Sequence, residues 1–147
     1  MLRDTTTIIT SISDDGILYY FDPLRSKILS ASRFKFGFSL RNKGIFISRY
    51  LGIAGGNIST QAGYLISKPS TIVSISARTK NNVNCMFNIL KDGVNIGSIT
   101  LSNENEKIDN SMNIDLSQGD FIQIVAMPTS GSIDYPCLTL ETSIRKS

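Results

Sequence analysis

The chain has 147 residues, a length that suits one domain with a substantial hydrophobic core and is too short for two domains and a linker. It contains 20 serines, 11 threonines, 11 asparagines and 21 isoleucines but only three glutamates and five alanines, a balance that favours β-structure over helix. The net charge is +3 and histidine is absent, which excludes His-dependent hydrolysis, imidazole general bases and His-containing metal sites, so we expect neither an enzyme nor a bound metal or cofactor.

The charges are segregated along the chain. Residues 23–91 hold eleven bases and no acid, whereas residues 92–134 hold seven acids and one base. Three explanations are open: a nucleic-acid surface, basic and acidic strands that lie side by side within the fold, or a basic face that meets an acidic face of another copy or of a partner. Because the bases are dispersed and form no dense run, we expect no nucleic-acid partner.

Residues 1–30 differ from the rest of the chain. Thr5-Thr6-Thr7, Asp14-Asp15-Gly16 and Asp22-Pro23 separate apolar pieces that are too short to form a core. We interpret this segment as an extended N-terminal arm that anchors on a partner; the alternative is a first strand pair of the main fold. The N-terminus lacks the apolar run of a signal peptide and no apolar stretch reaches 18 residues, so we expect a soluble, non-secretory protein without a membrane partner.

Alternation of apolar and polar residues begins at residue 31. Phe34, Phe36 and Phe38 share one side of an extended segment, and Arg33 and Lys35 share the other, which predicts a strand whose phenylalanine face fills the core. Asn42-Lys43-Gly44 then predicts a turn, residues 45–53 are again apolar, and residues 54–57 break the pattern.

Further strands follow at short spacings. We expect them over residues 64–67, 71–77, 85–89, 96–101, 108–116, 121–127 and 138–144. Lys91-Asp92-Gly93 predicts the clearest hairpin, whereas Asn81-Asn82, residues 102–107 and residues 128–136 are expected to end strands or form loops. The chain therefore predicts eight or nine antiparallel strands, no helix, and a β-sandwich or closed barrel.

Candidate catalytic and binding residues are few. Asp109, Asp115 and Asp120 could form a glycosidase pair, but the first two fall on the solvent side of a predicted strand and the third lies in a turn. Sugar binding by tyrosine side chains is an alternative, although the chain has no Trp. Cys85 and Cys137 both lie in alternating runs and are expected to be structural free thiols; their separation in space is not defined by the sequence.

The order of the later elements resembles a known module. The hairpin at Lys91-Asp92-Gly93, the strand 94–101, a polar loop, the strand 108–116, Gly119-Asp120 and a strand 121–127 resemble the C1q/TNF-like jelly-roll modules that form compact trimers. Upstream pieces are similar to a group of tailed-phage virion proteins that carry such a module: the segment 22–30, Phe36-Gly37, Arg49-Tyr50-Leu51, Ala62-Gly63-Tyr64 and the segment 71–77. The chain departs from these relatives in having no Trp near residues 25–27 and no collagen-like or coiled-coil stalk.

This resemblance implies an antiparallel jelly-roll β-sandwich over residues 31–147, preceded by the arm at 1–30. It implies a non-enzymatic virion structural protein, expected to be a capsid decoration or cement protein that stabilises the phage head as a symmetric oligomer. A tail or head fibre tip, or an adaptor that binds a host glycan or receptor, is the alternative. The implied partners are its own copies, as a homotrimer, and the major capsid protein or other virion proteins; the protein would be made in the host cytoplasm and reside in the virion.

The candidate partner contacts are the basic residues of the first half of the chain. They are Arg25, Lys27, Arg33, Lys35, Arg41, Lys43 and Arg49. We expect these side chains to face acidic surfaces of the capsid or of a neighbouring copy.

Overall fold

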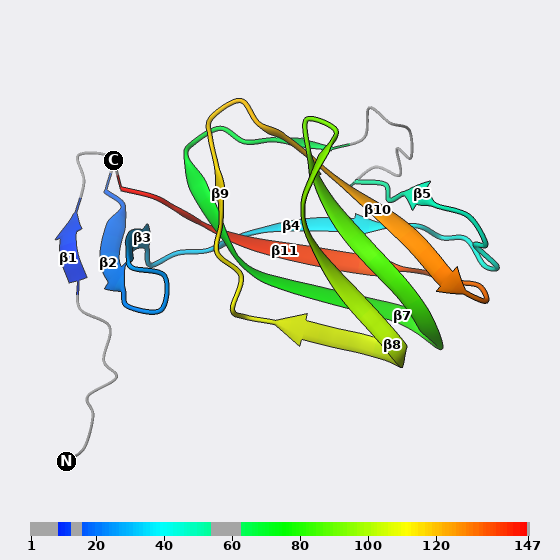
Figure 1. Cartoon of the computed structure of the whole chain (residues 1–147). Coiled ribbons are helices and arrows are strands. Elements are labelled where there is room, and N and C mark those ends of the chain that lie inside the picture. The colour runs from blue at the N-terminus through cyan, green and yellow to red at the C-terminus, as the bar shows by residue number, and fades with distance from the viewer. Residues whose placement is uncertain (1–8, 13–15, 54–62, 147) are drawn as a thin grey trace, which may run out of the picture.

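The computed structural model describes residues 9–12, 16–53 and 63–146, and this part of the chain contains strands, turns and loops but no helix (Figure 1). Its strands are β1 (Ile9–Ile12), β2 (Leu18–Asp22), β3 (Lys27–Ser30), β4 (Phe34–Ser39), β5 (Arg49–Tyr50), β6 (Tyr64–Leu65), β7 (Ser70–Lys91), β8 (Val94–Asp109), β9 (Ile114–Leu116), β10 (Phe121–Ser130) and β11 (Cys137–Ile144). Strands β1 to β3 form a small sheet at one end, and β4 to β11 form a curled sheet of eight strands.

The large sheet folds into two layers because β7 and β8 each run through both. In the first layer the order is β4, β11, the first half of β7, and then the end of β8 together with β9. In the second layer β5 and β6 both pair with β10, which pairs with the second half of β7, and the start of β8 completes the layer. All pairings are antiparallel, and this order confirms the predicted all-β jelly-roll sandwich.

Two segments that were predicted to interrupt strands instead lie within them. The register between β7 and β8 shifts between Arg78 and Val83, so Asn81-Asn82 marks a bend of β7 and not its end. Residues 102–107, predicted as a loop, belong to β8, where Asn103 takes a φ of 53° and its N–H donates to Asn84 Oδ1. The polar residues at both sites allow the strands to turn from one layer into the other.

The hairpin predicted at Lys91-Asp92-Gly93 is confirmed. Lys91 pairs with Val94, and the two residues between them have φ values of 49° and 83°. Two consecutive positive φ angles define a tight turn whose twist matches that of the flanking strands, and glycine adopts such an angle without strain.

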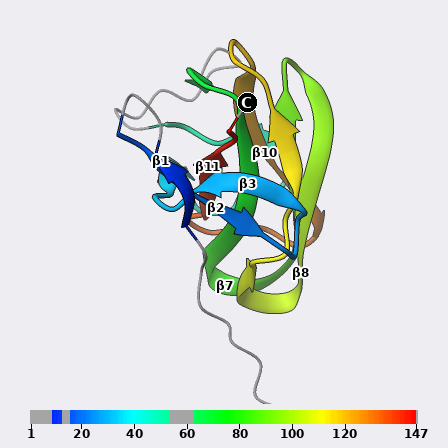
Figure 2. The same ribbon diagram turned by 90° about the vertical axis from the view of Figure 1, so that its left-hand side faces the viewer.

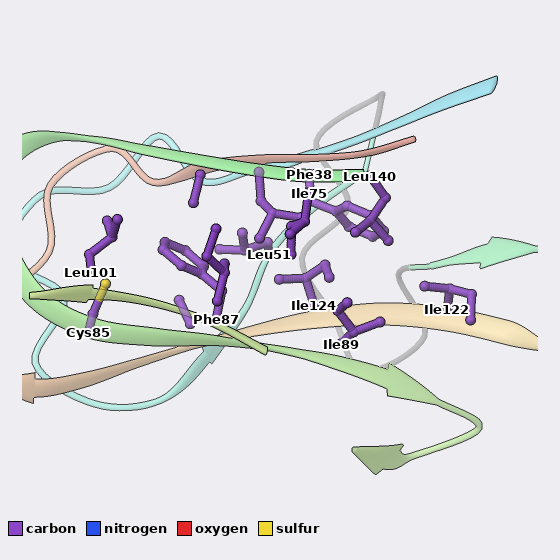
Figure 3. Packing of buried hydrophobic residues seen from close by; sticks show 14 of the residues in the cluster. Phe38, Leu51, Ile75, Cys85, Phe87, Ile89, Leu101, Ile122, Ile124 and Leu140 are labelled. Atoms are coloured by element: carbon purple, nitrogen blue, oxygen red, sulfur yellow. The ribbon is translucent and has the colours of Figure 1, made fainter. Parts of the chain in front are cut away.

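The core lies between the two layers (Figure 3). Phe38, Ile75 and Leu140 reach it from the first layer, and Phe87 and Ile124 reach it from the second; all are buried. The prediction that one face of β4 fills the core holds fully for Phe38 only. Phe36 is half-buried, and Phe34 is 47% exposed at the start of the strand.

The described part of the N-terminal segment packs on its own domain. Strands β2 and β3 form a hairpin that lies across one end of the jelly roll (Figure 2). Leu29 of β3 is fully buried and pairs with Arg145, and the N–H of Ile144 donates to Ser30 Oγ at 2.9 Å. For residues 16–30 the second alternative therefore holds: these residues form strands that pack on the main fold. Residues 1–8 and 13–15 lie outside the described part.

Arg25, at the tip of this hairpin, attaches it to the sandwich. Its guanidinium pairs with Asp22 (Nη1–Oδ2, 2.7 Å) and donates to three main-chain carbonyls, those of Val73 (2.7 Å), Asn110 (2.6 Å) and Met112. Both charged side chains are buried. The prediction that Arg25 contacts a partner is wrong, because its hydrogen-bond donors are directed at its own chain.

Replacing Arg25 should therefore destabilise the fold strongly. Arg25→Ala leaves the Asp22 carboxylate buried without its counter-ion and removes the donors to three carbonyls, and we expect a loss of about 3–5 kcal/mol in the free energy of unfolding. Urea denaturation followed by circular dichroism measures this loss. Arg33→Ala, an exposed control, should cost about 0.5 kcal/mol or less; equal effects of the two substitutions would contradict the structural role of Arg25.

Candidate functional site

Five of the seven predicted basic contacts are exposed along one side of the sandwich. We call them the basic edge: Arg33, Lys35, Arg41, Lys43 and Arg49. They lie on or beside β4 and β5, the strands that end the two layers on this side, and Ser39 and Gly52 join these strands through two backbone hydrogen bonds (2.9 and 2.8 Å). Within the described part of the chain none of the five forms an ion pair. Their charges are therefore available to a partner.

Lys27, the remaining candidate, is engaged within the fold. Its Nζ lies 2.6 Å from Asp115 Oδ1 and 2.5 Å from Asn113 Oδ1. Thr71 Oγ1 donates to the same Asp115 oxygen at 2.8 Å, and Arg145 Nη1 lies 3.4 Å from it. Lys27 thus anchors β3 to β9 and contributes little to a binding surface.

Part of the charge segregation is resolved by these internal pairs. Lys27 with Asp115, and Lys91 with Asp120 at 3.9 Å, each join the basic block of the sequence to the acidic block. The explanation that basic and acidic strands lie side by side is therefore correct for these residues. It does not extend to the basic edge, whose cations have no described carboxylate within ion-pair distance.

Two of the carboxylates considered as catalytic candidates, those of Asp109 and Asp115, have lowered pKa values. Partial burial of Asp115 opposes ionisation, but the hydrogen bonds from Lys27 and Thr71 and the charge of Arg145 outweigh it and lower the pKa. The side-chain and backbone hydrogen bonds from Ser111 lower the pKa of Asp109. A carboxyl group that acts as a general acid near neutral pH needs a raised pKa. The surroundings of Asp109 and Asp115 lower the pKa instead, which does not favour that role.

A groove opens beside the basic edge, between the start of β4 and the segment that follows β6. It has a volume of about 290 Å³ and is lined by apolar side chains that include Phe34, Phe36 and Leu65, with Lys35 among its lining residues. Tyr64 supports the lining residue Phe36 from behind: its ring packs on Phe36 and Phe38 at centroid distances of 5.0 and 5.2 Å, and its hydroxyl donates to Gly37 O. We call this the edge groove.

The two cysteines occupy opposite environments and are both free. Cys85 is buried in the core, and burial raises the pKa of its thiol to about 11. Cys137 is exposed, because on β11 it shares the outward side with Thr139 and Glu141. The prediction of two buried structural thiols is correct for Cys85 and wrong for Cys137.

One exposed feature was missed by the sequence analysis. Phe46 and Ile47 were described only as part of an apolar stretch, residues 45–53; they lie in the connection between β4 and β5, where they are 73% and 65% exposed. The neighbouring Gly44 and the cations on either side were the available signal, since a glycine turn with flanking bases is typical of a surface loop.

In the described residues there is no cluster of three metal-ligating side chains and no helix that could span a membrane.

Comparison with known proteins adds no assignment. No protein family matches the sequence, and no curated protein matches it. Among solved structures, the crystal structure of FLHE is similar over 79% of this chain and 100% of that chain, with 7% sequence identity and a TM-score of 0.35. A likeness at this TM-score carries no argument about function.

The lowered pKa of Asp115 predicts a pH-dependent contribution to stability. The contribution is present above the pKa of about 3.9 in the unfolded chain and is lost as the pH falls through the lower folded value. Asp115→Asn should therefore be less stable than the wild type at pH 7, with a difference that shrinks as the pH is lowered toward about 3. Denaturation over a pH series measures it; a difference that stays constant with pH would contradict the assignment.

The thiols should differ sharply in reactivity. At pH 8 the exposed Cys137 should react with Ellman's reagent at once, whereas Cys85 should react only on unfolding, because burial keeps the reagent out and raises the pKa of the Cys85 thiol to about 11. Cys137→Ser should abolish the fast phase and Cys85→Ser should leave it intact. Two fast thiols in the wild type would show that the core is not closed around Cys85.

Proposed function

We propose that this chain is a non-enzymatic structural protein of a tailed-phage virion, a decoration protein that binds the outside of the head as a symmetric oligomer. The observation that carries the proposal is the basic edge: five exposed cations on or beside β4 and β5 that form no ion pair within the described residues. The jelly-roll order of the strands agrees with the module that the sequence resembles. An acidic protein surface is the partner that this edge fits electrostatically.

The opposite edge of the sandwich offers a complementary surface for another copy. There β8 ends both layers, away from β4 and β5, and it carries Glu104, Glu106 and Asp109. A contact between unlike edges is heterologous, and such contacts close into a ring when the rotation between copies permits it. Three copies joined basic edge to acidic edge would form the homotrimer, and the cations beyond that contact would face the shell.

Attachment by such an edge is weak per contact and strong in sum. An exposed ion pair contributes about 0–1 kcal/mol, and salt screens it. A symmetric oligomer presents every contact several times, so the second and third attachments occur at high effective concentration. The mechanism is mechanical: many modest contacts distributed over neighbouring shell subunits resist their separation.

The edge groove favours a second function, recognition of a host glycan or receptor by a fibre tip or adaptor. Phe34 is 47% exposed where it lines this groove, and an exposed aromatic ring can stack on the apolar face of a sugar. In that case binding would depend on Phe34 and would be insensitive to salt, which separates the two functions experimentally.

Charge reversal on the basic edge tests the proposal. Lys35→Glu combined with Arg49→Glu should weaken binding to purified phage heads that lack the protein by about tenfold or more in low salt, because it turns attraction into repulsion. Co-sedimentation measures the bound fraction. Arg78→Glu, an exposed strand residue away from this edge, is the control and should change binding less than about twofold. Unchanged binding of the double variant would sink the proposal.

A further inference from the structure

Three connections meet at the end of the sandwich away from the N-terminal sheet (Figure 1). They are residues 40–47 after β4, the bend of β7 at residues 79–82, and residues 131–136 between β10 and β11. Ile45 and Ile133 exchange two backbone hydrogen bonds of 3.0 Å, Tyr135 N–H donates to Asn42 O, and Lys80 N–H donates to Asp134 O, both at 2.9 Å. We call this assembly the loop platform.

Side-chain hydrogen bonds fix the platform further. Asp134 Oδ1 accepts the N–H of Gly44 at 2.7 Å, and Asn81 accepts the N–H of Asp134 and donates to Ser132 O, both at 3.0 Å. Gly44 has a φ of 61°, which a residue with a side chain rarely adopts. The turn at Gly44 is therefore held from both sides, and the two residues that follow Ile45 project from a fixed backbone.

Those two residues, Phe46 and Ile47, form an apolar tip. They are adjacent and largely exposed, whereas Ile45 just before them is buried. Neither the edge groove nor the smaller hollow of about 230 Å³ on the outer face of the first layer is lined by either residue. Both side chains of the apolar tip therefore lie on the surface, outside these two hollows.

The surroundings of the apolar tip are cationic. Arg41, Lys43 and Lys80 are exposed on the platform, and Lys80 Nζ lies 5.7 Å from the centre of the Tyr135 ring. The carboxylate of the platform, that of Asp134, accepts the Gly44 N–H. An exposed pair of large apolar side chains on a platform that carries lysine and arginine matches the interfacial zone of an anionic bilayer, where apolar groups enter the acyl boundary and cations meet phosphates.

We propose that the loop platform docks on an anionic lipid surface, with Phe46 and Ile47 inserted and the three cations at the headgroups. A bilayer accommodates exposed apolar side chains without a preformed pocket, whereas a protein partner would have to supply one. This function goes beyond attachment to a virion shell; it shares Arg41 and Lys43 with the basic edge but depends on Phe46 and Ile47, which the shell contact does not use. The expectation of no membrane partner rested on the lack of a spanning stretch, and surface docking requires none.

Vesicle sedimentation with the full chain tests the proposal. Vesicles of phosphatidylcholine with about one-third phosphatidylglycerol should bind the protein, and vesicles of phosphatidylcholine alone should bind it at least about tenfold more weakly. Phe46→Ser with Ile47→Ser should lower the partition onto anionic vesicles by about tenfold or more. The matched control, Val94→Ser with Ile108→Ser, removes two equally exposed apolar side chains from β8 and should leave binding within about twofold.

A fluorescent reporter provides a second measurement. The chain has no Trp, so Phe46→Trp introduces a single one whose emission should shift to the blue on anionic vesicles. No binding to anionic vesicles, or equal binding of the double serine variant, would overturn the proposal. Loss of self-association in that variant, with no vesicle binding by the wild type, would assign the tip to a second copy and also overturn it. Binding of the Phe46→Ser, Ile47→Ser variant to phage heads is measured in a separate experiment. Failure of the lipid proposal can therefore be told apart from failure of the virion proposal.

Discussion

Strand β7 is the constraint on which the rest of the structure depends. Its 22 residues pair with β11, β10, β8 and β9, so one continuous segment contributes to both layers and places their inner faces opposite each other. The bend between Arg78 and Val83 makes this possible, and Thr79 Oγ1, buried at the bend, donates to Asn81 O at 2.6 Å. The same bend supplies Lys80 and Asn81 to the loop platform, so the fold and the exposed end are determined together.

The alternation of apolar and polar residues was enough to predict the strands and one turn. It did not predict that β7 and β8 continue through segments expected to interrupt them. Alternation located the core residues of β7 and β11, and Asp92-Gly93 located the hairpin, because both signals act between neighbours in the sequence. The sequence Asn81-Asn82 is compatible with the end of a strand and with a bend within one. Here the pairing of β7 with β8 on both sides of the bend keeps the strand continuous, and this pairing is a tertiary contact that local sequence does not reveal. Phe34 likewise has the same parity as Phe38 and differs only in lying at the start of the strand beside the edge groove.

The candidate site could be predicted only in part for the same reason. In the sequence Arg25 resembles Arg33: each is a base in a polar context. The structure separates them because the carbonyls of Val73, Asn110 and Met112, distant along the chain, converge on Arg25 and none converges on Arg33. The segregation of charge, in contrast, was visible from the start. Internal pairs at Lys27 and Lys91 account for part of it, and five further bases and three further acids of the described residues lie on opposite edges of one sandwich.

Opposed basic and acidic edges on a rigid jelly roll are the physical basis for proposing a protein that decorates a shell. The most direct test is the position of the protein on the particle, determined by cryo-electron microscopy of purified virions. Density repeated across the head lattice, with β4 and β5 turned toward the shell or a neighbouring copy, is the predicted result. Density confined to the tail or a fibre tip, with these strands facing solvent, would contradict it.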